Sequence, residues 1–225
     1  MIARHLRYGS HSATPVRLAV VAAAGAVTAS LLVSCSSSTP HVDAYTYNPE
    51  KAAVDVDTAD LRRQKAIAGI PNCPRSTQGA TQQDKGLPPI TLPCLGGGRD
   101  VDLAGLTGPP TVLNFWAQTC GPCRQESPLF QRLHDSGAVR VVGVDFLDPL
   151  PDRAIAFAKE LGLTYPQVAD PEGATRAPLH VSGLPMTMFV DSQGVVRHVE
   201  YGAVRSAASL AALVSTYLAV HVDLG

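Results

Sequence analysis

The chain has 225 residues, with 18 basic and 19 acidic side chains and a formal net charge of −1. This length suits one domain of about 140 residues together with a leader segment, and such a domain buries enough surface to fold alone. The charges form no basic patch, so we expect no nucleic-acid partner.

Residues 1–34 are predicted to be a secretory signal peptide. Three arginines without an acid precede an apolar stretch of 16 residues at 18–33, and Cys35 follows in a sequence that has the form of a lipobox. We therefore expect cleavage before Cys35 and a lipid anchor on its side chain. The alternative is an uncleaved transmembrane helix, although 16 residues are short beside a usual span of about 20. Either interpretation exports the rest of the chain.

Three further segments are predicted after the signal peptide. Residues 35–57 contain serine, threonine, proline and scattered acids, which indicates a flexible tether. Residues 58–85 are expected to form a helical extension, whose short helix begins at Asp57 or Thr58 and is ended by a glycine. Residues 86–225 are the predicted main domain.

The motif that decides the function follows an apolar strand expected at 111–115. Cys120-Gly121-Pro122-Cys123 places two thiols one helical turn apart, and the next residues carry apolar side chains at helical spacing. Cys120 is therefore expected at a helix start, where unpaired N–H groups and the helix dipole stabilise a thiolate. Cys123, one turn further, is placed to resolve a mixed disulfide. The motif predicts thiol-disulfide exchange.

The same C-x-x-C spacing also occurs in zinc sites and in structural disulfides. A zinc site needs two further ligands, and the sequence has neither a second C-x-x-C nor a histidine pair at ligand spacing. A permanently closed disulfide fits poorly with a helix start that activates one sulfur. We expect no metal, and no cofactor apart from a redox-active Cys120–Cys123 disulfide.

The sequence around the motif, from Asn114 to Pro128, resembles the active-site segment of the thioredoxin superfamily, in particular the TlpA/ResA/CcmG-like thiol-disulfide oxidoreductases. The similarity covers residues 86–220 and continues, in the family's order and spacing, through 164–166, 170–173, 181–191 and Gly194. It implies an α/β thioredoxin-like fold, with a central mixed β-sheet flanked by helices, a TlpA-type insertion and an N-terminal extension.

The resemblance also implies roles for residues near the cysteines. TlpA-like proteins share Asn114, where thioredoxins have a buried acid, and they have a glutamate at the position of Glu126. We expect Glu126 to accept a proton from the cysteine pair or to tune its pKa. The alternative is an acid near the helix N-terminus that only complements the dipole. Thr119 stands where the family usually has tryptophan, which thins the apolar collar around the cysteines.

Leu184-Pro185 is the second functional element that the resemblance implies. In the superfamily the matching X-Pro bond is cis and lies against the cysteine pair, where the residue before the proline pairs with an extended substrate peptide. An ordinary turn before a strand is the alternative. The residues expected to contact substrate are Trp116, Thr119, Gly121, Pro122, Leu184 and Pro185.

The later elements alternate as in an α/β fold. We expect a buried strand at 140–146, a helix at 152–161, a β-hairpin of 186–190 and 195–201, and an amphipathic helix at 206–219. The stretch from the helix expected at 152–161 through Asp170 corresponds to the TlpA-type insertion that the resemblance implies.

Two of the five cysteines remain after Cys35 is assigned to lipid and the C-x-x-C pair to catalysis. In an oxidising compartment, Cys73 and Cys94 most economically form a structural disulfide, which would join the N-terminal helix to a strand near 90–94. The alternative is a second redox pair that relays electrons to the catalytic pair.

The combined prediction is a membrane-tethered extracytoplasmic thiol-disulfide oxidoreductase in which Cys120 attacks and Cys123 resolves. The resemblance implies a monomer that reduces disulfides of exported proteins, including apocytochrome c before haem attachment, and that exchanges electrons with a membrane redox partner. A DsbA-like thiol oxidase is one alternative. A Cu(I)-binding module is another, against which Pro185 and the lack of a third soft ligand argue.

Overall fold

The computed structural model describes residues 53–225; the predicted signal peptide, Cys35 and most of the predicted tether lie outside the described residues. The central sheet consists of β3 (Thr111–Trp116), β4 (Arg140–Phe146), β5 (Gln167–Asp170), β6 (Met186–Val190) and β7 (Val196–Tyr201). Its strand order is β5-β4-β3-β6-β7, with β3, β4 and β5 parallel to one another and β6 antiparallel to both its neighbours. This sheet confirms the predicted α/β fold with a central mixed sheet.

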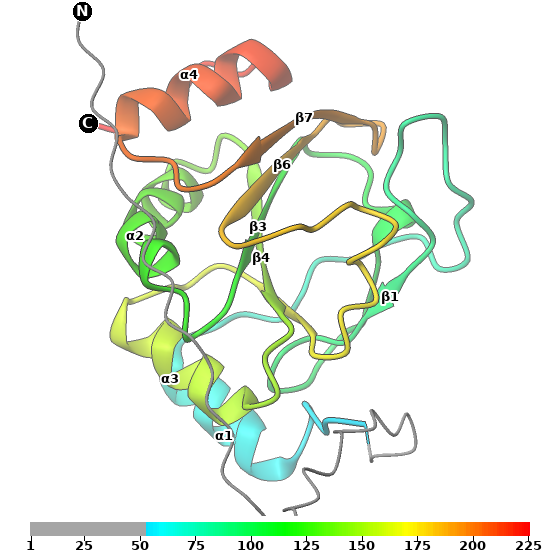
Figure 1. Ribbon diagram of the computed structural model, residues 1–225, viewed down its shortest axis with the longest axis vertical. Helices are drawn as coiled ribbons and strands as arrows, with labels where there is room; N and C mark the ends of the chain where they lie inside the picture. The colour runs from blue at the N-terminus through cyan, green and yellow to red at the C-terminus, as the bar shows by residue number, and fades with distance from the viewer. Residues whose placement is uncertain (1–52) are drawn as a thin grey trace, which may run out of the picture. The chain divides into compact units, whose positions relative to one another are not determined.

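In the described part of the chain, four α-helices flank the sheet: α1 (Ala59–Ala68), α2 (Gly121–Asp135), α3 (Pro151–Glu160) and α4 (Ala207–Leu218). Crossovers between parallel strands are almost always right-handed, so the successive crossovers through α2 and α3 place both helices on one face. Side chains from all four helices share an apolar cluster on that face. The opposite face is covered by loops and a small sheet of β1 (Thr91–Leu92) and β2 (Val101–Asp102). Figure 1 shows α2, α3 and α1 on one side of the sheet and β1 on the other.

Local sequence explains where the elements begin and end. Thr58 caps α1 by accepting a hydrogen bond from the Leu61 amide, and Gly69 ends this helix with a φ of 72°, which glycine adopts without strain. The predicted strand at 140–146 and the β-hairpin are confirmed, and α3 begins at Pro151, one residue earlier than predicted. Proline suits the first turn of a helix because its missing N–H would be unpaired there. No helix among the described residues is long and apolar enough to cross a membrane.

Residues 93–95, near the start of the predicted main domain, pair with the sheet edge formed by β5. The Leu95 amide donates to the Gln167 carbonyl and the Ala169 amide donates to the Pro93 carbonyl, both at 2.9 Å. A disulfide joins Cys94, which lies between these bonds, to Cys73. Residues 93–95 therefore extend the sheet beyond β5, and the disulfide holds them to the segment that follows α1.

Candidate active site

The two cysteines of the C-x-x-C motif lie at the start of α2, in different surroundings. Cys120 is the N-cap residue and is partly exposed, whereas Cys123 is fully buried. The Cys120 sulfur accepts a hydrogen bond from the Cys123 amide, with a distance of 3.2 Å between sulfur and nitrogen. The two sulfurs are joined in a disulfide, so the structure describes the oxidised pair.

This asymmetry determines which sulfur an incoming group can reach. Attack from solvent meets Cys120 first, because the Cys123 side chain is enclosed in the apolar cluster. When the pair is reduced, the amide that now faces the Cys120 sulfur would stabilise a thiolate there, and the positive end of the helix dipole acts in the same direction. Burial without such a donor favours the neutral thiol at Cys123.

Glu126 lies one helical turn after Cys123, on the same side of α2. Its side chain is only 1% exposed. One carboxylate oxygen accepts a hydrogen bond from the Asn114 amide group and the other accepts one from the Val204 backbone amide, both at 2.8 Å. Burial raises the pKa of Glu126 to about 7, although these two hydrogen bonds partly oppose the shift. This environment differs from that of a solvated acid that only complements a helix dipole.

A surface cavity of about 290 Å³ borders Glu126. It is lined by Pro122, Gln125, Glu126, Ala203, Val204 and Arg205. A buried acid with a pKa near neutrality can exchange a proton with water through such an opening. The site therefore has the parts needed to move a proton beside the buried cysteine.

The Leu184–Pro185 peptide bond is cis, and the Pro185 carbonyl accepts a hydrogen bond of 3.0 Å from the Gly202 amide. A second cavity, of about 140 Å³, lies beside this bond and is lined by residues 182–185 together with Tyr201 and Gly202. Both cavities border the segment from Tyr201 to Arg205, which leads from β7 into α4. This segment thus links the cis-proline loop to the helix that carries the cysteines.

The other residues expected to contact substrate fall into two groups. Thr119, Gly121 and Pro122 are exposed around the cysteine pair. Trp116, by contrast, is 1% exposed, stacks on Phe157 with ring centroids 4.8 Å apart, and donates a hydrogen bond of 2.9 Å to the Gln167 side chain. Its indole ring packs in the core against α3 and offers almost no surface to a substrate.

Two aspartates that the sequence interpretation missed lie near the loop that precedes Cys120, and one of them is hydrogen-bonded to it. Asp148 accepts hydrogen bonds from the amides of Gln118 and Leu150, at 3.1 and 3.0 Å. Asp145 is 1% exposed, and its pKa is raised well above the usual range by burial and, secondarily, by Asp148. The sequence signal for Asp145 was an acidic residue inside an otherwise apolar strand, β4. Within residues 53–225, no group of three histidine, cysteine or acidic side chains could hold a metal ion.

The fold and the cysteine site together define a thiol-disulfide oxidoreductase of the thioredoxin-like class. A family model described as AhpC/TSA family matches residues 84–199, and the chain belongs to this family.

Named relatives agree with this assignment. The chain is 32% identical over 139 residues to the thiol:disulfide interchange protein CycY of Rhizobium leguminosarum, covering 61% of this chain and 70% of the relative. It is 31% identical over 121 residues to the thiol:disulfide interchange protein DsbE of Pseudomonas fluorescens, covering 53% and 67%. The solved structure of Mycobacterium tuberculosis DsbF aligns with a TM-score of 0.52 at 30% identity, covering 57% of this chain and 95% of DsbF. The predicted thioredoxin-like fold and oxidoreductase class are thereby confirmed.

Proposed function

We propose that the protein is a disulfide reductase that acts on exported proteins outside the cell membrane. The observation that carries this proposal is the unequal placement of the two sulfurs. Cys120 faces solvent at the N-cap of α2, whereas Cys123 is buried one turn from a carboxyl group whose pKa is about 7. A nucleophile, a resolving thiol and a proton acceptor are thus available in order along one helix.

In the proposed reaction, the Cys120 thiolate attacks a disulfide of the substrate, and one substrate sulfur leaves and takes up a proton. Glu126, ionised at this stage, accepts the proton of the Cys123 thiol. The Cys123 thiolate then attacks the Cys120 sulfur, breaks the mixed disulfide and releases the second substrate thiol. Two electrons pass to the substrate, and the enzyme ends in the oxidised state described by the structure.

The substrate and the location follow from the resemblance and the N-terminal sequence. Cysteine pairs of exported proteins, including apocytochrome c, are the proposed substrates, and a membrane reductase is the proposed source of electrons. The lipobox-like sequence supports a lipid anchor at Cys35. Replacing Cys35 by Ala should release the protein into the soluble fraction, whereas unchanged retention in membranes would favour a transmembrane helix.

The direction of electron flow is tested by the reduction potential of the Cys120/Cys123 pair, measured by alkylation of the peptide that contains both cysteines. Insulin reduction is followed in parallel, with Cys120→Ser as the inactive control. A potential near that of thioredoxin, about −270 mV, together with insulin turnover supports a reductase. A potential near that of DsbA, about −120 mV, would overturn the proposed direction and identify an oxidase.

The order of the two cysteines is tested by trapping. Cys123→Ser should accumulate a mixed disulfide with a substrate peptide through Cys120, because the resolving thiol is missing. Cys120→Ser should form no such adduct, since Cys123 is buried. Equal trapping by both variants would contradict the assignment of Cys120 as the nucleophile.

A further inference from the structure

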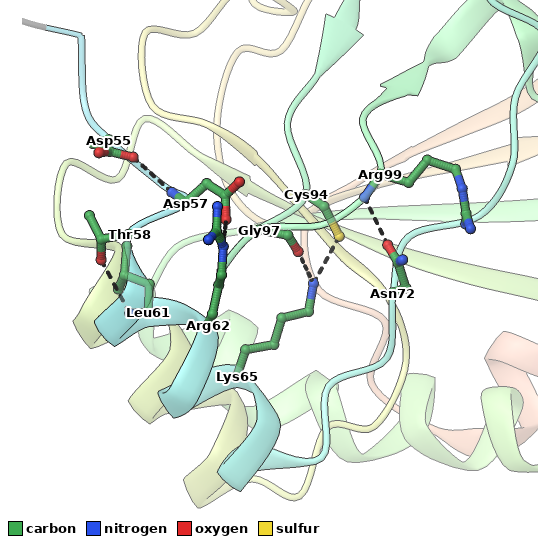
Figure 2. A network of polar contacts seen from close by, with 10 residues as sticks. All are labelled: Asp55, Asp57, Thr58, Leu61, Arg62, Lys65, Asn72, Cys94, Gly97 and Arg99. Carbon is green, nitrogen blue, oxygen red and sulfur yellow. Dashed lines mark hydrogen bonds and ion pairs between the residues drawn. The ribbon is translucent and has the colours of Figure 1, made fainter.

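The Cys73–Cys94 disulfide has a buried lysine at one of its sulfurs. Lys65 extends from α1 so that its Nζ lies 3.0 Å from the Cys94 sulfur and donates a hydrogen bond of 2.6 Å to the Gly97 carbonyl (Figure 2). Lys65 is only 7% exposed, although lysine is rarely buried unless it is paired. The carboxylate whose charge acts on Lys65 is that of Asp57, which already binds the Arg62 side chain.

The chain encloses this lysine closely. A Cβ atom added at Gly96, where φ is +70°, would lie 2.9 Å from the Lys65 Cβ. Burial lowers the pKa of Lys65, and the carboxylate of Asp57 opposes that shift. The Gly97 carbonyl, the Cys94 sulfur and the Asp57 charge are the features that compensate for burying an amine here. The contact between the Lys65 amine and the Cys94 sulfur therefore bears on the chemistry of this disulfide.

A cation at this position favours the reduced pair over the oxidised one. A disulfide sulfur is a weak hydrogen-bond acceptor with no net charge, whereas a thiolate carries a full negative charge and is a strong acceptor. Lys65 therefore gains more from a Cys94 thiolate than from the disulfide, and the low dielectric of a buried site strengthens the difference. Stabilising the reduced form of a cysteine pair makes its disulfide easier to reduce.

The other sulfur has the opposite environment. The Cys73 sulfur lies 3.1 Å from the Gln167 backbone carbonyl oxygen, and the one cation bonded to this residue within the described part of the chain, Arg99, donates to its backbone carbonyl at 2.6 Å and not to its sulfur. A carbonyl oxygen disfavours an anion at this distance but accepts a hydrogen bond from a neutral S–H group. After reduction, the structure therefore favours a thiol at Cys73 and a thiolate at Cys94.

The Cys73 sulfur should also be easier for an external thiolate to reach than the Cys94 sulfur. Both cysteines are 1% exposed. Cys94 belongs to the strand-like segment that pairs with β5. Cys73 belongs to an irregular segment, 71–85, in which most residues are exposed. Segments with few buried contacts open locally at low cost, so local opening uncovers Cys73 before Cys94.

We propose that Cys73–Cys94 is a second thiol-disulfide exchange site, at which an external dithiol attacks Cys73 and Cys94 leaves as a thiolate bound to Lys65. The attacking thiolate forms a mixed disulfide with Cys73, and the electron pair of the broken bond moves to Cys94. The second thiolate of the dithiol then attacks its own partner sulfur and forms an external disulfide. Cys73 leaves with the electron pair and takes up a proton, so two electrons have entered the protein.

The test isolates this pair in the full chain with Cys35, Cys120 and Cys123 replaced by Ser. Dithiothreitol is the dithiol, and the equilibrium constant for reduction at pH 7 is measured by alkylation and mass spectrometry, with circular dichroism as a check on folding. Lys65→Met removes the buried charge. Arg63→Met is the matched control, because Arg63 lies on the same helix but is exposed and pairs with Asp60.

We expect Lys65→Met to lower the equilibrium constant for reduction about tenfold, the factor expected for one hydrogen bond to a charged group. Arg63→Met should leave it unchanged within about twofold. Equal constants for the two variants would overturn the proposal. So would a disulfide that opens only where circular dichroism shows global unfolding.

A second measurement requires no change at Lys65. In the reduced protein, the thiolate absorbance of Cys94 should show a pKa below the ordinary thiol value of about 8.5, with Cys73 titrating above Cys94. A Cys94 pKa at or above the ordinary value would refute the role of Lys65, whether or not Lys65→Met folds. Because the active-site cysteines are absent from this protein, failure here leaves the proposed reductase function untouched.

Discussion

Replacing Glu126 by Gln should change how the stability of the oxidised protein depends on pH. The pKa of Glu126 is about 7 in the folded protein and 4.5 when the side chain is solvated. Between these values the folded state binds more protons than the unfolded state, so the free energy of unfolding falls as pH rises. The shift of 2.5 units corresponds to a total loss of about 3 kcal/mol, most of it between pH 5 and pH 8.

Gln cannot ionise, so the variant should lack this loss. Its amide oxygen can accept from either Asn114 or Val204 but leaves the other donor facing an NH₂ group, which costs about 1 kcal/mol. We therefore expect Glu126→Gln to be about as stable as wild type near pH 5 and more stable near pH 8.5, by about 2 kcal/mol. The two stability curves should diverge as pH rises.

The assay is urea unfolding of the oxidised protein at pH 5 to 8.5 without reductant. Comparison with wild type cancels contributions common to both proteins, including that of the buried Asp145. Glu160→Gln is the control, since Glu160 is an exposed acid on α3, and its curve should run parallel to wild type. If the Glu126→Gln curve were also parallel, burial would not be setting the pKa of Glu126, and its assignment as a neutral-pH proton acceptor would fail.

Three further predictions concern stability. Replacing Cys73 and Cys94 together by Ala should lower the free energy of unfolding by about 3 kcal/mol in the chain-entropy description of a 21-residue separation, and an unchanged urea midpoint would contradict it. Trp116→Phe leaves the buried Gln167 side-chain oxygen without its indole donor and should cost about 2 kcal/mol by urea unfolding; a loss below about 0.5 kcal/mol would show that the hydrogen bond is dispensable. Ala219 ends α4 with a φ of 53°, so Ala219→Gly should raise stability by about 1 kcal/mol, whereas a lower melting temperature would refute the strain argument.

Much of the fold was predictable because its signals are local. An apolar run before the C-x-x-C motif predicted β3, and the turn between two β-rich runs predicted the β6–β7 hairpin. The start of α2 at Cys120 followed from the same short stretch. These predictions needed only residues within one or two turns of each other.

The surroundings of the site depend on contacts between distant parts of the chain. The bond between Glu126 and Val204 joins residues 78 positions apart, and that between Lys65 and Cys94 joins residues 29 apart. No periodicity or spacing encodes such pairings. Lys65 in particular lies on a short polar helix, where the pattern alone indicates a solvated side chain, and only the packing of residues 94–98 over α1 buries it.

The strand-like segment at 93–95 also covers the edge of β5, where a second copy of the chain could otherwise pair. Without it, β5 would present a row of unpaired backbone groups, and such an edge readily captures a strand from another molecule. The chain meets this hazard while it folds, before any substrate is present. The link to Cys73 keeps the covering strand in place when the edge fluctuates, because the strand cannot drift away from the chain that follows α1. Removing the residues before 86 would take away Cys73, leave residues 93–95 without this link, and thereby promote association through β5, even if the cysteines of α2 remained correctly placed.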